Sequence, residues 1–176
     1  MLPLSPHPAG VAAIATFAAS AQRLDGGGLR LRYALGGALE TVAWPAPGAG
    51  ERRDELWRHT CCEAFVRVAD EEGYREFNFS PAGDWAAYAF TGYRAGMQPL
   101  ALAGAPAMRW QHGTEQALLE VTLPLELPGA APLRLALAGV VERRDGALGW
   151  WALHHPPGAP DFHHPAAFVV TLPPLL

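Results

Sequence analysis

Hydrophobic and polar side chains alternate with a period of two along most of this chain. Between residues 29 and 35, the leucines and Tyr33 fall on odd positions, with Arg30 and Arg32 between them. Successive side chains of a β-strand point to opposite faces, so this pattern is typical of strands with one buried face. No window of twelve or more residues carries a helical stripe free of glycine and proline. The chain is therefore expected to be all-β.

The alternating segments are short and are separated by turn residues. Nineteen glycines and seventeen prolines are spread along the 176 residues, as in a chain with many turns. About nine or ten strands at this spacing predict an antiparallel two-sheet β-sandwich, forming a single domain over residues 1–176. The expected strands cover residues 11–23, 29–35, 60–68, 74–79, 85–90, 108–111, 117–123, 133–142, 149–154 and 168–172, with a glycine turn at 26–28 and an acidic turn at 70–73.

The net charge and the cysteine content limit which kinds of partner and which cellular compartment are expected. A net charge of −4 with no long basic run argues against nucleic acid as a partner. Cys61 and Cys62 are adjacent, so a bridge between them would need a strained loop, and we interpret both as reduced thiols. Residues 11–21 resemble the apolar part of a signal peptide, but residues 1–10 contain no Lys or Arg. A cytoplasmic protein without a membrane-spanning segment is expected, with export as the alternative.

The segment from Trp57 to Trp85 has the character of a ligand-binding face. By strand alternation, Glu63 lies on the face opposite the apolar residues of 60–68, and Glu76 and Asn78 share one face of the next strand. One sheet can place these three side chains together. Carboxylates and amides hydrogen-bond hydroxyl pairs, and Trp57 or Trp85 can cover the apolar face of a sugar ring or another flat ligand.

Two alternatives remain for the same residues. The first is a solvated outer face with ordinary cross-strand pairs such as Glu63 with Arg75. The second is a glycoside hydrolase in which Glu63 and Glu76 act as the acid and as the nucleophile or base. Nothing in the sequence indicates carboxyl pKa values suited to catalysis, and no Gly-x-Ser-x-Gly elbow, P-loop or dinucleotide fingerprint is present. A site that is not catalytic is therefore expected.

A histidine-rich segment near the C-terminus offers a second candidate site. His154, His155, Asp161, His163 and His164 could together bind a transition metal. However, three prolines stiffen the segment, no pair has helical spacing, and each His-His pair splits across strand faces. A rigid loop in which these side chains hydrogen-bond to the backbone is the simpler interpretation.

A pattern of motifs spans nearly the whole chain. It begins as Arg53-Asp54-x-Leu56-Trp57-x-x-Thr60-Cys61-x-Glu63-x-Phe65. It continues as Tyr74-x-Glu76-Phe77-Asn78-x-Ser80-Pro81-x-Gly83-x-Trp85-x-x-Tyr88-x-Phe90-x-x-Tyr93-Arg94, and ends as Trp151-Ala152-Leu153-x-His155-x-x-Gly158-x-Pro160-Asp161-Phe162-His163. As a set, these motifs resemble the DOMON-like proteins of proteobacteria, which are related to family 9 carbohydrate-binding modules.

The resemblance implies a jelly-roll β-sandwich with a non-catalytic ligand-binding role, the ligands being sugars or haem across the superfamily. In the sugar-binding relatives an acid follows a tryptophan by six residues, as Glu63 follows Trp57 here. The next strand then contributes two polar residues spaced by two, which Glu76 and Asn78 match. A basic residue would be more typical at Glu76, so the resemblance does not extend to specificity for reducing-end sugars.

The resemblance also extends the expected ligand-binding set. A second tryptophan closes the sugar clamp in those relatives, and Trp151 is the leading candidate here, followed by Trp85. Other polar positions of the motifs join the set: Arg94, His155, Asp161 and His163.

Haem-binding relatives use axial Met and His ligands. Neither Met97 nor Met108 lies in a motif that aligns with theirs. No cofactor is therefore expected, with haem or a metal ion as the alternative. The expected partner is a small-molecule ligand, a sugar by the resemblance, and the oligomeric state is left open.

Overall fold

The computed structural model describes residues 1–25 and 27–175, and within them the chain is all-β and antiparallel, as predicted. Part of the glycine turn expected at 26–28 lies outside the described residues. Three short 3-10 turns accompany the strands: η1 (Leu39–Thr41), η2 (Leu56–Arg58) and η3 (Pro165–Ala167). The strands are β1 (Leu2–Pro6), β2 (Thr16–Arg23), β3 (Leu29–Gly36), β4 (Cys61–Val68), β5 (Tyr74–Phe79), β6 (Trp85–Phe90), β7 (Gln98–Pro99), β8 (Ala107–His112), β9 (Gln116–Leu123), β10 (Leu133–Glu142), β11 (Leu148–Ala152) and β12 (Val170–Leu172).

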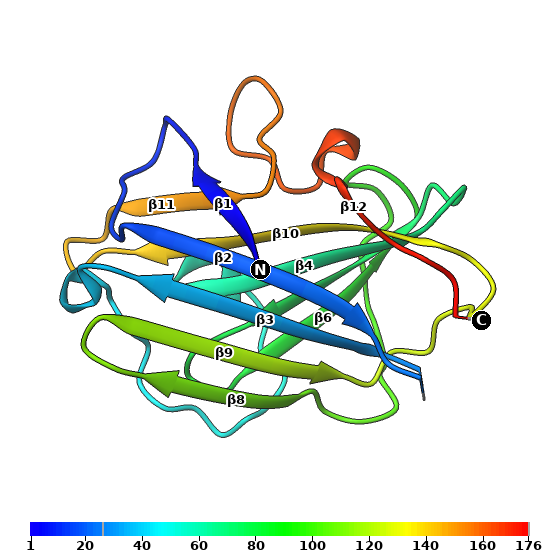
Figure 1. The fold of residues 1–176 in the computed structure, drawn as a ribbon, viewed down its shortest axis with the longest axis horizontal. Coiled ribbons are helices and arrows are strands. Elements are labelled where there is room, and N and C mark those ends of the chain that lie inside the picture. Colours follow the sequence, from blue (N-terminus) through cyan, green and yellow to red (C-terminus); the bar gives the residue numbers. More distant parts are fainter. Residues whose placement is uncertain (26, 176) are drawn as a thin grey trace.

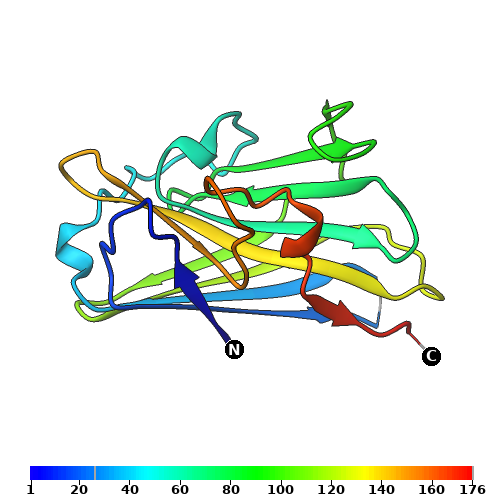
Figure 2. The same ribbon diagram turned by 90° about the horizontal axis from the view of Figure 1, so that it is seen from above.

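The strands are connected in one path that curls like a half-barrel (Figures 1 and 2). Their order is β7-β6-β5-β4-β10-β11-β1-β2-β3-β9-β8, with β12 pairing beside β10. β1 joins the two halves, because Leu2 to Leu4 pair with β2 while Ser5 and Pro6 pair with β11. This strand was not expected from the sequence, since prolines at positions 3 and 6 weaken the strand signal.

The main core lies between the two halves of the curled sheet. The odd residues of β3, including Leu31 and Tyr33, are fully buried there, together with Cys62 and Ala64 of β4. Period-two alternation predicted both of these faces, and the structure confirms them. The Tyr33 hydroxyl donates a 2.8 Å hydrogen bond to the backbone oxygen of Glu63, which ties β3 to β4 across the core. Cys61 and Cys62 are both buried free thiols.

A second, smaller core covers the other face of β4, β10 and β11. Phe65 and Tyr74 from the sheet pack there against Phe162 and Phe168 from the C-terminal segment. That segment passes over β10 and β11 before it reaches η3 and β12 (Figure 1). The face that carries Glu63 is therefore enclosed by a loop, rather than solvated.

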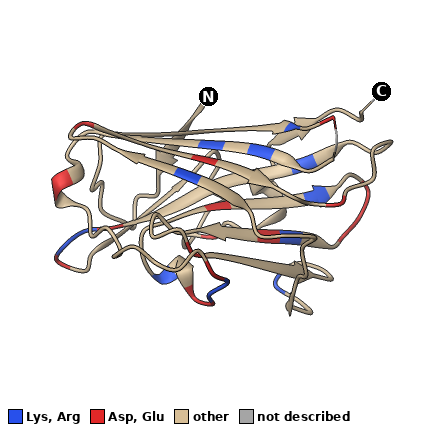
Figure 3. Ribbon diagram, turned by 90° about the horizontal axis from the view of Figure 1, so that it is seen from below, with Lys and Arg blue, Asp and Glu red and all other residues tan. Residues whose placement is uncertain are grey.

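The half of the sheet that contains β3 and β9 has an outer face exposed to solvent. A solvated face of this kind was one of the alternatives for the face that carries Glu63. Arg32 lies directly opposite Glu120 and pairs with it at 2.6 Å, with both side chains in contact with solvent. Basic and acidic positions are interspersed along the strands and turns in Figure 3. None of the helical segments in the described part of the chain is long and apolar enough to cross a membrane.

Candidate functional site

The register between β4 and β5 brings Glu63, Glu76 and Asn78 onto one face. Glu63 lies directly opposite Asn78, and Phe65 directly opposite Glu76. Residues opposite each other in an antiparallel pair point to the same side of the sheet, so the two carboxyl groups are diagonal neighbours. All three polar side chains are buried, with relative exposures of 3% for Glu63, 4% for Glu76 and 0% for Asn78. Arg75, the partner considered for Glu63, lies on the opposite face beside Val66.

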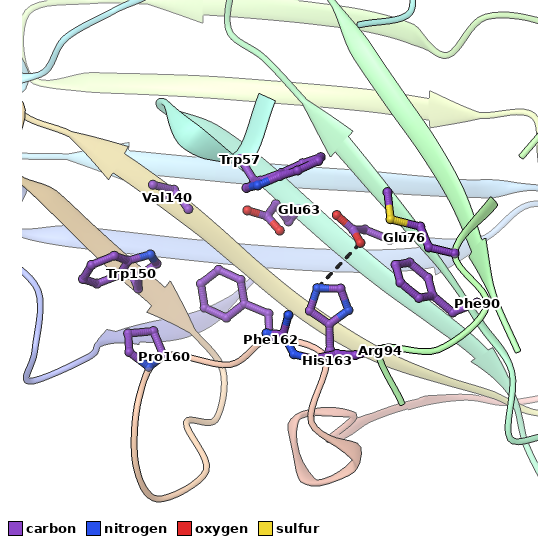
Figure 4. A pocket seen from close by; sticks show the side chains of 11 residues that line it. Trp57, Glu63, Glu76, Phe90, Arg94, Val140, Trp150, Pro160, Phe162 and His163 are labelled. Carbon is purple, nitrogen blue, oxygen red and sulfur yellow. Dashed lines mark ion pairs between the residues drawn. The ribbon is translucent and has the colours of Figure 1, made fainter. Parts of the chain in front are cut away.

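These carboxyl groups open into a cavity of about 340 Å³. In Figure 4 both point into the space between Trp57 on one side and Phe162 and His163 on the other. The side chains around them come from η2, β4, β5, β6, β10, β11 and the loops at 91–97 and 153–164. The lining residues are Trp57, Glu63, Glu76, Phe90, Arg94, Met97, Val140, Trp150, Pro160, Phe162 and His163.

Small residues beside the acids leave room for this cavity. Ala138 on β10 lies directly opposite Glu63, and Ala86 on β6 lies directly opposite Asn78. Both alanines are buried, and neither projects far enough to fill the space above the carboxyl groups. A larger side chain at either position would occupy the floor of the cavity.

Burial raises the pKa of both carboxyl groups. The pKa of Glu63 lies well above its usual value because of desolvation, to which the nearby Glu76 charge adds. Desolvation also raises the pKa of Glu76 to about 7, against the opposing effects of its hydrogen bond from Asn78 and of the Arg94 charge. Glu63 therefore keeps its proton to a higher pH than an exposed glutamate, and Glu76 is close to the midpoint of its titration at neutral pH.

A hydrogen-bonded chain fixes the tautomer of His163. The Arg94 backbone N–H donates to the Tyr74 hydroxyl oxygen at 3.3 Å, and Tyr74 lies 2.7 Å from His163 Nδ1. The remaining ring nitrogen, Nε2, is 3.7 Å from Glu76 Oε2. Burial, followed by the Arg94 charge, lowers the pKa of His163 to about 4. We therefore assign a neutral imidazole that accepts from Tyr74 at Nδ1 and carries its proton on Nε2, facing Glu76.

Asp161 holds the rim of the cavity in place. Its two carboxylate oxygens accept from Arg94 Nη2 at 2.7 Å and from the Tyr93 hydroxyl at 2.5 Å, and Oδ1 also accepts from the His163 backbone N–H at 3.1 Å. Partial burial alone would raise the pKa of Asp161, but these hydrogen bonds and the Arg94 charge outweigh it and lower the pKa. The positive charge of Arg94 is therefore paired with the negative charge of Asp161 at the rim of the cavity.

Two acceptor atoms on this side of the sheet, one of them from a residue that lines the cavity, have no hydrogen-bond partner among the described residues. They are Oε1 of Glu63 and Oδ1 of Asn78, both of them buried. The Asn78 amide nitrogen is already engaged, because it donates to Glu76 Oε1 at 2.8 Å. Buried polar atoms are nearly always paired, so unpaired ones that face a cavity indicate where a ligand would bind.

The structure brings together most of the residues predicted from the sequence. Trp57, Glu63, Glu76, Arg94 and His163 line the cavity. Two further predicted residues support it from behind: Asn78 holds Glu76, and Asp161 holds Arg94.

Three predicted residues lie elsewhere. Trp151 faces the main core, where its ring lies 6.1 Å from that of Phe17, because it is opposite Gly139 on the inner side of β10. Trp85 is directly opposite Phe79 on β5 and also points to the inner side. His155 Nε2 donates a 2.8 Å hydrogen bond to the backbone oxygen of Ser5, and the ring does not line the cavity.

Sequence reasoning missed Trp150, the residue beside the predicted Trp151. Trp150 lies opposite Val140, which in turn lies opposite Cys61, so alternation places all three on the Glu63 face. Following the alternation of side chains from Cys61 through Val140 to Trp150 would have placed Trp150 on the Glu63 face. Phe162 and Pro160 were also missed as wall residues, and a loop has no periodicity from which their direction could be read.

The histidines and Asp161 of the C-terminal segment lie apart from one another in their contacts: Asp161 pairs with Arg94, His155 with the backbone of Ser5, and His163 with Tyr74. Within the part of the chain described by the structure, no group of three or more His, Cys, Asp or Glu side chains converges as metal ligands would. Of the two methionines considered as haem ligands, Met97 lines the cavity, whereas Met108 lies on β8 in the other half of the sheet.

Comparison with known proteins gives a likeness in fold. No protein-family model matches the chain, and none of the curated proteins matches it. Among solved structures, a protein of Bacteroides uniformis that is provisionally described as carbohydrate-binding aligns with a TM-score of 0.63 and 16% sequence identity. The alignment covers 95% of this chain and 84% of that chain. At this level of identity the likeness shows a shared fold.

Proposed function

We propose that this protein is a non-catalytic binding domain whose cavity takes a carbohydrate or a similar polyhydroxylated small molecule. The observation that carries the proposal is the pair of buried carboxyl groups, Glu63 and Glu76, at the floor of a cavity with Trp57 and Trp150 in its walls, with Asn78 holding Glu76 from behind. We further assign the fold to the jelly-roll sandwich of DOMON-like and family 9 carbohydrate-binding proteins. The likeness to the Bacteroides uniformis protein, itself provisionally described as carbohydrate-binding, supports both assignments.

The chemistry of the cavity suits a sugar. Carboxyl and amide oxygens accept hydrogen bonds from hydroxyl groups, and aromatic rings cover the apolar C–H faces of a pyranose. A volume of about 340 Å³ is near the lower end for ligand pockets, which favours one small ligand over a long polymer chain. No cofactor forms part of the proposal.

Titration with a panel of mono- and oligosaccharides tests the proposal. Binding is followed by tryptophan fluorescence and by calorimetry, in the wild type and in Trp150→Ala. We expect at least one sugar to bind the wild type and its affinity to fall by tenfold or more in Trp150→Ala, because the variant loses one aromatic wall. A folded wild-type protein that binds no member of the panel would overturn the proposal.

The raised carboxyl pKa values favour one second candidate. A carboxylic acid that stays protonated near neutral pH beside a second carboxyl group is what glycoside hydrolysis uses. Incubating the bound sugar with the protein over a pH series separates the two functions. Our proposal requires binding without turnover, whereas turnover that Glu63→Gln abolishes would establish the hydrolase instead.

A further inference from the structure

Several donors close to the carboxyl groups already contact other groups of the protein. The Asn78 amide donates to Glu76, and the Arg94 guanidinium donates to Asp161. The Tyr74 hydroxyl lies 2.7 Å from His163 Nδ1, and His163 Nε2 faces Glu76 Oε2 at 3.7 Å. A ligand that reaches the cavity floor therefore meets the Glu63 and Glu76 carboxyl groups, whose oxygens all act as acceptors once the groups are deprotonated.

Two of these acceptors are deeply buried and unpartnered in the described residues. Glu63 Oε1 belongs to a side chain that is 3% exposed and lines the cavity, and Asn78 Oδ1 belongs to one that is 0% exposed. Leaving such atoms unpaired costs free energy, which a ligand bearing donors regains. A hydroxyl group brings one donor together with lone pairs, whereas an ammonium group brings three donors, no lone pair and a compensating charge.

We infer that the ligand carries a protonated amino group, which binds at the floor of the cavity between Glu63 and Glu76. This inference rests on the proposed function and narrows it: the ligand class is a polyhydroxylated molecule with an amine, such as an amino sugar. The ammonium donates to Glu63 Oε1 and to Glu76, while the hydroxyl groups and the ring face Trp57 and Trp150.

The residues in the walls and at the rim of the cavity are compatible with a cationic ligand. Trp57, Phe90, Trp150 and Phe162 contribute aromatic surface around the acids, and aromatic faces attract cations. Arg94, the one basic side chain that lines the cavity, has its charge matched by Asp161 at 2.7 Å. His163 adds no charge near neutral pH, because burial lowers its pKa to about 4. The ligand thus meets acids without a competing free cation.

Binding of an ammonium should displace protons. Both carboxyl groups have raised pKa values in the free protein, so they keep their protons to a higher pH than exposed glutamates do. When the ammonium arrives, its charge stabilises the carboxylates, and the displaced proton passes to the buffer. A neutral sugar provides no such charge and should release none.

Matched sugars test the inference by calorimetry, each titration being run in two buffers of different ionisation enthalpy. The probes are D-glucosamine, D-glucose and N-acetyl-D-glucosamine, with the corresponding galactose series, at a pH where the sugar amines are protonated. We expect an amino sugar to bind at least about tenfold more tightly than both its neutral counterparts, because a charge-assisted hydrogen bond exceeds a neutral one by about 1.4 kcal/mol. We also expect proton release for the amino sugar alone.

Glu63→Gln is the test variant and Glu72→Gln, at an exposed turn position, is its control. We expect the preference for the amino sugar and the proton release to disappear in Glu63→Gln and to persist in Glu72→Gln. Neutral sugars that bind as tightly as the amino sugars would overturn the inference while leaving the proposed function standing. Absence of binding by every sugar, with the wild type folded, would overturn both.

Discussion

Glu63 and Asn78 lie directly opposite each other on β4 and β5, and each has a buried oxygen without a partner in the described residues. The Asn78 nitrogen is held by Glu76, so the amide oxygen is left facing the cavity side of the sheet. On a solvated strand face, water would hydrogen-bond these acceptors, whereas here they are buried. Such a site has a cost in stability that a ligand can offset.

The buried Glu63 should make the protein less stable as pH rises. Its pKa in the folded state lies well above the ordinary 4.5, so between these two values the unfolded chain loses the proton first. The free energy of unfolding then falls with rising pH, by at most about 1.4 kcal/mol per pH unit for one proton. His163 acts in the opposite direction between its folded pKa of about 4 and 6.5, and therefore offsets part of the effect in the wild type.

Glu63→Gln isolates that contribution, because Gln resembles the neutral acid and cannot ionise. Denaturant unfolding across a pH series should show the variant gaining stability relative to the wild type as pH rises above 4.5. Glu72→Gln, the exposed control, should follow the wild type. A constant difference between Glu63→Gln and the wild type at all pH values would contradict the assigned protonation.

The two neighbouring tryptophans of β11 should separate stability from binding. Trp151 is 3% exposed and packs against Phe17, so Trp151→Ala should cost about 3–5 kcal/mol of unfolding free energy. Trp150 is half-buried in the cavity wall, so Trp150→Ala should cost nearer about 1 kcal/mol while strongly weakening ligand binding. Denaturant unfolding and calorimetric titration measure the two effects. Equal losses of stability in both variants would contradict the assigned faces.

His163 should remain neutral to unusually low pH and carry its proton on Nε2. Long-range proton–nitrogen NMR spectra report both properties, and His163→Gln identifies the signal. We expect titration with a pKa of about 4 and an Nδ1 that accepts from Tyr74. In Tyr74→Phe the buried Nδ1 loses its donor, which should cost about 1–3 kcal/mol of stability and release the tautomer. A proton on Nδ1 in the wild type would refute the hydrogen-bonded chain.

Local alternation was enough to predict most of the strands and the inner faces. It placed Leu31 and Tyr33 in the core and put Glu63, Glu76 and Asn78 on one face. It could not show that this face is buried, because the covering segment comes from residues 153–168, about 90 residues further along the chain than Glu63. Alternation also could not predict that β1 joins the two halves of the sheet, because β1 contains two prolines and each of its ends pairs with a different strand.

The choice between Trp150 and Trp151 failed for a related reason. The motif resemblance favoured Trp151, but the direction of a strand residue depends on the register with its neighbours. Val140 on β10 fixes that register, and it places Trp150 on the cavity side. The register of the strands, and not the resemblance in sequence, decides which of the two tryptophans faces the cavity.

We propose above that a ligand binds in the cavity over Glu63 and Glu76. Proton–nitrogen NMR of the six tryptophan indole groups tests it directly, with each signal assigned by substitution and each sugar of the matched set added in turn. We expect the signals of Trp57 and Trp150 to shift with the bound sugar, and those of Trp151 and Trp85 to stay in place. Shifts confined to Trp151 or Trp85, or no shift in any indole signal, would contradict it.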